Sequence, residues 1–122
     1  MLGYVSLGTN DLELACKFYD ELMASIGHKR IFDLDGFVTW GLSLEHPGVA
    51  VTRPFDGSDA TVGNGVMVAM LMPSKEAVDT FYTKAIELGA SDEGAPGQRG
   101  EGFYAGYFRD LDGNKLNAFY MG

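Results

Sequence analysis

Few residues in this chain have the chemistry of metal ligands, nucleophiles or acid–base catalysts, and their positions favour other roles. The two histidines lie in predicted loops: His28 follows a glycine that ends a helix, and His46 lies in a Glu-His-Pro-Gly turn. Cys16 lies on a predicted helix with no evident base, so we expect a small buried hydrophobic residue rather than a nucleophile. The two Asp-Leu-Asp-Gly stretches, 33–36 and 110–113, are typical of hairpin turns before they indicate acid–base pairs.

The overall charge disfavours several classes of partner. The chain has 122 residues, enough for one domain with its own core, and its 9 basic and 17 acidic side chains give a net charge of −8. Such a charge repels nucleic acid and anionic lipid; it favours a cationic small molecule if it does more than keep the protein soluble. No apolar run is long enough to span a membrane. A single cysteine and no secretory leader pattern lead us to expect a cytoplasmic protein.

The chain contains an internal repeat. A shift of 63 positions places residues 4–7 on residues 67–70 and Phe18-Tyr19 on Phe81-Tyr82, so each half has the pattern of a strand, a helix and three strands. We therefore expect a single α+β domain of two βαβββ modules, related by a pseudo-twofold axis and forming an incomplete mixed β-barrel. The domain covers residues 1–122, with module 1 at 1–53, a linker at 54–64 and module 2 at 65–122.

Capping residues predict where the two helices begin and end. Asn10 begins the first helix, with Glu13 completing a capping-box pattern, and Gly27 ends it. Pro73-Ser74 begins the second helix, and Gly89 ends it.

The segment that follows the second helix is rich in glycine. We predict a long loop over residues 91–106, either a lid that brings Arg99 or Glu101 over a ligand or a surface loop without fixed structure.

The alternation of side chains along a strand predicts which residues share a face. In the first strand, Val5 and Leu7 should face the helix, and Tyr4 should face the opposite, concave side. The repeat of Tyr4 is Met67, which we expect at the centre of a strand over 65–72, also on the concave side. The same alternation places Asn117 and Phe119 of the last strand there.

These segments resemble the vicinal oxygen chelate superfamily, which includes glyoxalases, extradiol dioxygenases, fosfomycin-resistance proteins and bleomycin-resistance proteins. Residues 7–22, LGTNDLELACKFYDEL, are similar to its first strand and helix, and residues 107–119, YFRDLDGNKLNAF, are similar to its closing hairpin. The resemblance covers essentially the whole chain and implies the two-module fold. It leaves the activity open, because the superfamily carries many chemistries on one scaffold.

In metal-using relatives, four positions, two in each module, hold a divalent ion with His, Gln or Glu. Carried over to this chain, these positions fall on Tyr4, Met67, Asn117 and, by an offset of 65 between the last strands, Thr52. None is a good ligand for Zn, Ni, Mn or Fe(II). The resemblance therefore implies no metal, and we expect no other cofactor. Met67 would then line an apolar, adaptable pocket or fill the interior of the barrel.

The resemblance also implies a set of pocket residues. Fosfomycin-resistance relatives have a tyrosine that contacts the ligand at the position of Tyr107. The offset of 65 makes Trp40 the repeat equivalent of Ala105, which is expected on the concave side, so Trp40 is expected there as well. The predicted ligand-binding residues are Tyr4, Trp40, Thr52, Met67, Tyr107, Asn117 and Phe119. This mostly aromatic and apolar set fits the capture of a small molecule, although the same aromatic side chains would also serve to fill the interior.

The sequence leaves three functions open. We favour metal-independent binding of a small organic molecule, cationic or aromatic, in the manner of the bleomycin-resistance proteins. The alternative is a metal-dependent lyase or dioxygenase of the glyoxalase type with non-standard ligands, which a one-residue error in strand register would allow. The third is metal-free acid–base catalysis by Tyr4, Tyr107 or Arg109. Whether the protein is an enzyme stays open, and the resemblance implies a homodimer whose cavities form within one chain or between two.

Overall fold

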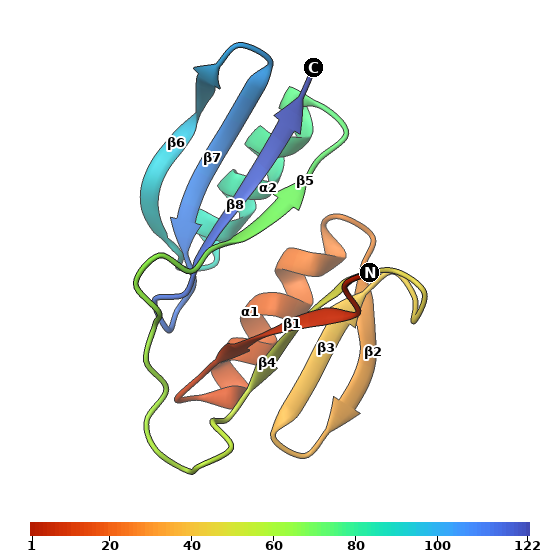
Figure 1. Cartoon of the computed structure of the whole chain (residues 1–122), viewed down its shortest axis with the longest axis vertical. Coiled ribbons are helices and arrows are strands. Elements are labelled where there is room, and N and C mark those ends of the chain that lie inside the picture. Colours follow the sequence, from red (N-terminus) through yellow and green to blue (C-terminus); the bar gives the residue numbers. More distant parts are fainter. The chain divides into compact units, whose positions relative to one another are not determined.

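Each half of the chain folds into the same series of elements: one strand, one helix and three further strands. The computed structural model describes all residues, Met1–Gly122, and divides them into two units, unit 1 at Met1–Val62 and unit 2 at Gly63–Gly122 (Figure 1). The elements of unit 1 are β1 (Tyr4–Gly8), α1 (Leu12–Ala24), β2 (Lys29–Leu34), β3 (Phe37–Gly41) and β4 (Gly48–Thr52). The elements of unit 2 are β5 (Val68–Leu71), α2 (Lys75–Glu87), β6 (Ser91–Gly100), β7 (Phe103–Arg109) and β8 (Lys115–Met121).

The strands form two separate four-stranded sheets with equivalent topology. The strand order is β1-β4-β3-β2 in unit 1 and β5-β8-β7-β6 in unit 2. In each sheet the first and last strands of the unit pair in parallel, and the other pairs are antiparallel. The predicted α+β class and the βαβββ order of both modules are confirmed. Neither helix is long and apolar enough to cross a bilayer.

Side-chain caps define where the helices begin. The N-cap of α1 is Asp11, whose Oδ1 accepts a hydrogen bond from the backbone N–H of Leu14 at 3.1 Å, so the prediction of Asn10 is wrong by one residue. The side-chain amide of Asn10 instead donates to the carbonyl oxygen of Ala60 and accepts from its backbone N–H, which holds the end of unit 1 next to the start of α1. Of the predicted pair Pro73-Ser74, Ser74 is the N-cap of α2, and its Oγ accepts a hydrogen bond from the backbone N–H of Ala77.

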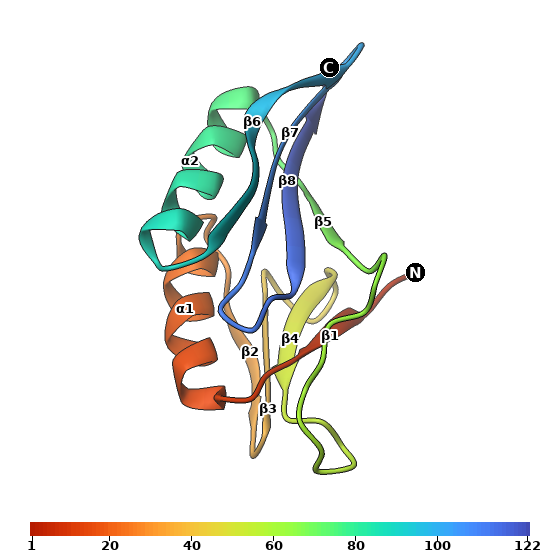
Figure 2. The same cartoon turned by 90° about the vertical axis from the view of Figure 1, so that its left-hand side faces the viewer.

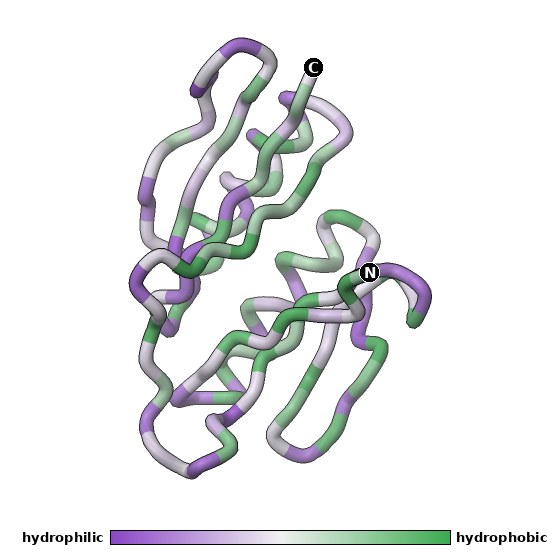
Figure 3. Tube along the Cα trace, viewed as in Figure 1, coloured by the Kyte–Doolittle hydropathy of each residue, from purple (hydrophilic) through white to green (hydrophobic).

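In unit 1, α1 packs against one face of the sheet (Figure 2). Its apolar residues recur at helical spacing, and hydrophobic and hydrophilic positions alternate along both helices in Figure 3, as expected for helices with one buried face. The buried side chains of α1 are Ala15, Cys16, Phe18, Tyr19, Leu22 and Met23. The ring of Tyr19 lies 5.5 Å from that of Trp40 on β3, and both side chains are almost fully buried.

Unit 2 has a smaller core of the same design. Helix α2 buries Val78, Phe81 and Ala85. The ring of Phe81 lies 6.0 Å from that of Phe108 on β7. The register pairs Phe108 with Leu116 on β8, and neither side chain is exposed.

The glycine-rich segment after α2 is a strand, so the prediction of a long loop or lid over residues 91–106 is wrong. Its first ten residues form β6, which pairs with β7 along an irregular register with three shifts. Pro96 lies in one of the irregular stretches, where its missing N–H removes no regular ladder bond. Sequence composition predicted a loop because glycine and proline are rare in strands, but an edge strand with bulges tolerates both.

The close approach of β6 to β7 at Gly106 gives a test of this register. A Cβ at Gly106 would lie 2.9 Å from Cγ of Pro96 and 3.3 Å from its backbone N. We therefore expect Gly106→Ala to lower the free energy of unfolding by about 1–3 kcal/mol through overpacking. Urea denaturation should show a lower midpoint.

The matched control is Gly100→Ala on the same strand pair, where a Cβ would meet no atom within 4 Å. This variant should stay within about 0.5 kcal/mol of the unchanged protein. Equal destabilisation by both variants would contradict the register at Pro96.

Candidate functional site

The face of each sheet that its own helix does not cover is called here the helix-free face. In unit 1 this face carries Tyr4, which is 50% exposed and contacts the ring of Phe37 at 5.4 Å. Thr52 lies on the same face by register, and its Oγ1 lies 3.0 Å from the carbonyl oxygen of Gly36 and 2.9 Å from that of Arg53. Thr39 is fully buried there, and its Oγ1 has no hydrogen-bond partner.

Trp40 is not on the helix-free face, so this part of the predicted site is wrong. Its side chain is fully buried, contacts Tyr19 of α1, and donates a hydrogen bond from Nε1 to Oδ1 of Asp20 at 2.8 Å. Its structural counterpart in unit 2 is therefore Phe108, which packs against α2 in the same way, rather than Ala105.

The error comes from the connections between strands. The segment between β3 and β4, residues 42–47, is one residue longer than the segment between β7 and β8, residues 110–114. The repeat offset between the last strands of the two modules therefore differs by one residue from the offset between the strands before them. An error of one residue along a strand places every side chain on the opposite face of the sheet.

The strand pairing in the two sheets also shows that Thr52 is not the repeat equivalent of Asn117. Ala50 pairs with Ser6 and Thr39, whereas Asn117 pairs with Ala69 and Tyr107. Because Ser6 and Ala69 are matched by the repeat, Asn117 corresponds to Ala50, and Thr52 lies two residues further along the same face.

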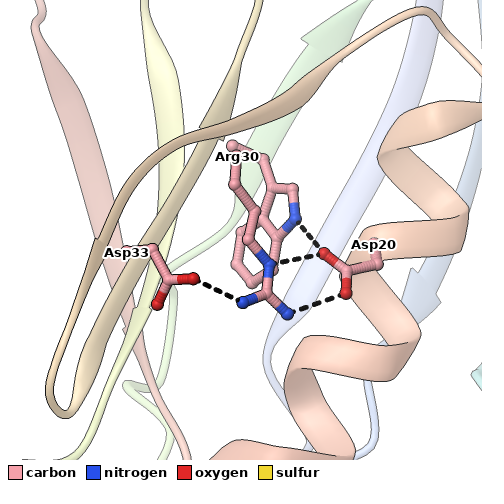
Figure 4. Close-up of polar contacts among 4 residues, drawn as sticks. Asp20, Arg30 and Asp33 are labelled. Carbon is pink, nitrogen blue, oxygen red and sulfur yellow. Dashed lines mark hydrogen bonds and ion pairs between the residues drawn. The ribbon is translucent and has the colours of Figure 1, made fainter.

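Trp40 belongs to a polar cluster at the edge of unit 1. The guanidinium of Arg30 lies between Asp20 and Asp33 (Figure 4), with Nη2 2.7 Å from Oδ2 of Asp20 and Nη1 2.9 Å from Oδ2 of Asp33. Hydrogen bonds from Arg30 hold the pKa of Asp20 below its ordinary value, with burial opposing them and the bond from Trp40 adding to them. The cluster therefore orients the indole and has no free acid or base for catalysis.

Substitutions of Asp20 separate its hydrogen bond from its charge. Asp20→Ala leaves the buried indole N–H unpaired and should lower the free energy of unfolding by about 1–3 kcal/mol. Asp20→Asn keeps an acceptor for the indole and loses a half-exposed ion pair, which should cost no more than about 1 kcal/mol. Urea unfolding followed by fluorescence of the one tryptophan measures both. Equal losses in the two variants would show that the ion pair dominates.

The lowered pKa of Asp20 also predicts an acid dependence. A carboxyl whose pKa is lower in the folded protein contributes stability above its unfolded pKa of about 4, and this contribution is lost as the pH falls through the folded pKa. The stability difference between the unchanged protein and Asp20→Asn should therefore shrink on going from neutral to strongly acidic pH. A difference that stays constant over this range would contradict it.

A cavity of about 470 Å³ opens between α1 and the β2–β3 hairpin, away from the helix-free face. Leucine, cysteine and valine side chains, Cys16 among them, line part of it, and charged side chains line most of the rest. Cys16 is buried, as predicted, and burial raises the pKa of its thiol, so the thiol stays protonated at neutral pH. This thiol is unsuited to nucleophilic chemistry.

In unit 2 the structure brings three of the predicted residues together on the helix-free face. Tyr107 and Asn117 are direct partners in the β7–β8 ladder, and Phe119 follows on the same face, with its ring 5.5 Å from that of Phe103. Asn117 is 1% exposed, and its Oδ1 has no hydrogen-bond partner.

Met67 is not at the centre of a strand, contrary to the prediction. The parallel ladder with β8 begins at Val68, because residues 64 and 65 form a turn, with Gly65 at a φ of +98°. Met67 therefore lies just before β5 and is 39% exposed.

Two cations outside the predicted ligand-binding set lie against Tyr107, and one of them, Arg99, was expected only on a lid. Cζ of Arg99 is 5.5 Å and Nζ of Lys115 is 5.6 Å from the centroid of its ring. The alternation that placed Asn117 on this face also places Lys115 there, so that signal was available from the sequence. The position of Arg99 was not, since it depends on the irregular pairing of β6.

The other polar groups at this end of the sheet have structural partners. Nε of Arg109 is 3.0 Å from Oε1 of Glu93, and Nη1 donates to the carbonyl oxygen of Gly113. Asp110 accepts hydrogen bonds from the backbone N–H groups of Asp112 and Asn114 and holds the turn between β7 and β8, as its hairpin motif predicted.

The donor atoms at the carried-over positions do not fit a divalent ion of the transition series. They are a half-exposed phenol at Tyr4, a hydroxyl bonded to carbonyls at Thr52, a thioether at Met67 and an amide at Asn117, whereas such ions require imidazole, thiolate or carboxylate. In neither unit do three or more His, Cys, Asp or Glu side chains form a group that could hold a metal.

One of the two histidines has a shifted pKa. Burial lowers the pKa of His28, in unit 1, below its ordinary value.

Comparisons with known proteins identify relatives over the whole length. The sequence pattern of the Glyoxalase/Bleomycin resistance protein/Dioxygenase superfamily matches residues 1–118. The crystal structure of a glyoxalase/bleomycin resistance protein from Albidiferax ferrireducens T118 is 32% identical, with a TM-score of 0.91 over 100% of this chain and 99% of that one. A hypothetical protein from S. aureus is 25% identical, with a TM-score of 0.76 over 98% of this chain and 92% of that one.

A glyoxalase/bleomycin resistance protein/dioxygenase family enzyme from Burkholderia phytofirmans PsJN is 19% identical, with a TM-score of 0.79 over 98% of both chains, and shows likeness of fold alone. No curated protein matches the chain.

Proposed function

Because the chain belongs to the Glyoxalase/Bleomycin resistance protein/Dioxygenase superfamily, we propose that it binds a small organic molecule without the help of a metal ion. The helix-free face of each sheet, taken by itself, supplies candidate binding residues. Trp40 leaves the set predicted from the sequence because it is buried against α1. The residues that stay in this proposal are Tyr4, Thr52, Met67, Tyr107, Asn117 and Phe119.

One observation carries the proposal. The four positions that hold a metal in metal-using relatives have a phenol, a hydroxyl, a thioether and an amide here, and the hydroxyl of Thr52 is already bonded to backbone carbonyls. These groups bind polar and aromatic molecules well and divalent transition-metal ions poorly.

The lining of unit 2 supports an organic ligand. Phe103, Tyr107 and Phe119 expose part of their rings on one face, and the amide of Asn117 lies beside them. Apolar rings with a few placed polar groups are typical of small-molecule sites. The expectation of an aromatic ligand therefore stays, whereas that of a cationic ligand rests only on the net charge of the whole chain.

Two further expectations belong to this proposal. A homodimer is the expected assembly, to be tested by sedimentation equilibrium across a hundredfold range of concentration. A reducing cytoplasmic location is consistent with the unpaired thiol of Cys16, since a protein with one cysteine gains no disulfide from an oxidising compartment.

Metal binding tests the proposal directly. Elemental analysis of protein purified without chelator or affinity tag should find no stoichiometric metal, and calorimetric titration with Ni, Zn, Mn and Fe(II) should give no binding near one ion per chain. Stoichiometric uptake of any of them would favour the alternative, a metal-dependent lyase or dioxygenase with non-standard ligands.

Ligand binding is tested by thermal shift with a set of aromatic compounds. A ligand at a hundred times its dissociation constant stabilises the protein by about 2.7 kcal/mol, enough for a clear rise in Tm. Tyr107→Ala should reduce the shift, whereas Tyr104→Ala should not, because Tyr104 alternates with Tyr107 on β7 and bonds Asp79 of α2. Equal effects of the two variants would contradict the assignment of the helix-free face.

A further inference from the structure

We propose that the cavity between α1 and the β2–β3 hairpin of unit 1 is a separate small-molecule site, which binds a zwitterion. Such a molecule carries one ammonium group, one carboxylate and an apolar or aromatic side chain, as an amino acid does. The cavity lies on the side of the sheet that α1 covers, away from the helix-free face. It is therefore independent of the proposed function, and either of the two can fail alone.

The cavity lies where α1 leaves the hairpin uncovered. The β2–β3 hairpin reaches past the N-terminal end of α1 in both views (Figure 1 and Figure 2). The N-terminal half of α1 lines the cavity with two pairs of side chains at a spacing of four residues, Leu12 with Cys16 and Glu13 with Lys17. The volume of about 470 Å³ lies in the range of small-molecule sites, about 300–1,000 Å³.

The floor of the cavity is apolar. Cys16 and Val38 line it and are 8% and 3% exposed. Burial raises the pKa of the Cys16 thiol, so this side chain adds no charge to the floor at neutral pH. Leu12 and Leu34 extend the apolar surface toward the solvent. An apolar side chain of a ligand would lose contact with water here.

The charges around this floor balance each other. Six charged side chains line the cavity, three acidic and three basic: Glu13, Asp33, Asp35, Lys17, Arg30 and Arg53. Their formal charges cancel, whereas the whole chain has a net charge of −8. A ligand with a single charge would meet both attraction and repulsion, but a zwitterion can direct each of its charges toward a side chain of opposite sign. The balance therefore favours a dipolar ligand.

Four of the six charges already have partners within unit 1. Arg30 binds Asp33 and also Asp20 of α1 (Figure 4). Nη1 of Arg53 lies 3.6 Å from Oδ1 of Asp35, a loose pair between exposed side chains. These pairs form part of the wall of the cavity and need no ligand to neutralise them.

The other two charges are available to a ligand. Glu13 and Lys17 are exposed neighbours on α1, and neither has an ion-pair partner. Since both line the same cavity, one molecule can reach both. The ammonium group of the ligand is assigned to Glu13 and its carboxylate to Lys17.

Four compounds with the same benzyl side chain test the charge requirement. Phenylalanine is a zwitterion, N-acetylphenylalanine an anion, phenylalaninamide a cation and N-acetylphenylalaninamide neutral. Titrations at low salt, followed by ¹H–¹⁵N spectra, report both affinity and location. We expect phenylalanine to bind about fivefold more tightly than each of the others, a modest factor because exposed charge pairs contribute little and are screened by salt. The shifts should lie in residues 12–17 and 33–38.

Charge reversal tests the assignment of the two groups. Lys17→Glu should transfer the preference to phenylalaninamide, and Glu13→Lys should transfer it to N-acetylphenylalanine. A loss of fold would weaken all four compounds and would not exchange their order. The matched control is Glu76→Lys, because Glu76 is the repeat equivalent of Glu13 in the first turn of α2 and does not line the cavity. This variant should keep the order of the unchanged protein.

The outcomes separate this inference from the proposed function. A preference for phenylalanine that the two reversals exchange, with shifts in residues 12–17 and 33–38, supports the zwitterion site. Equal affinity for the four compounds, tightest binding of a singly charged compound to the unchanged protein, or an order that the reversals leave intact overturns it. Shifts confined to β7 and β8 overturn it as well and support the proposed function. The absence of any shift up to the solubility limit of phenylalanine overturns the zwitterion site.

Discussion

In each unit, an aromatic contact between the helix and the sheet determines which residues remain for binding. Tyr19 on α1 packs against Trp40 on β3, and Phe81 on α2 packs against Phe108 on β7. Each contact assigns one face of its sheet to the core. Since side chains alternate along a strand, it also assigns Thr39 and Tyr107 to the helix-free faces.

The same constraint explains why a tryptophan that looks suited to ligand binding is structural. The indole of Trp40 is large enough to fill the gap between α1 and the sheet, and its N–H requires an acceptor once it is buried. Asp20 provides that acceptor, and Arg30 in turn holds Asp20. The cluster of Asp20, Arg30 and Trp40 has residue types that also occur in catalytic sites, but here each side chain holds a neighbouring side chain in position.

Charge acts at two scales in this protein. The net charge of −8 describes the average surface, whereas two cationic side chains, Arg99 and Lys115, both lie close to the ring of Tyr107 in unit 2. Two acidic groups in the neighbouring strand and turn are used elsewhere: Glu93 pairs with Arg109, and Asp110 holds a turn. Net charge alone is therefore a poor guide to the ligand of a small protein with few cations.

The sequence by itself determined the fold class, the two βαβββ modules and the approximate ends of both helices, because the 63-residue repeat, the periodicity and the capping residues are local signals. It also identified Tyr107, Asn117 and Phe119 as neighbours, since a tight hairpin joins their strands. The tertiary structure decided the face of Trp40, the start of β5 after Met67, and the strand that contains Arg99. Each of these depends on a loop length, a turn or a bulge, where one residue more or less reverses the face of every side chain that follows.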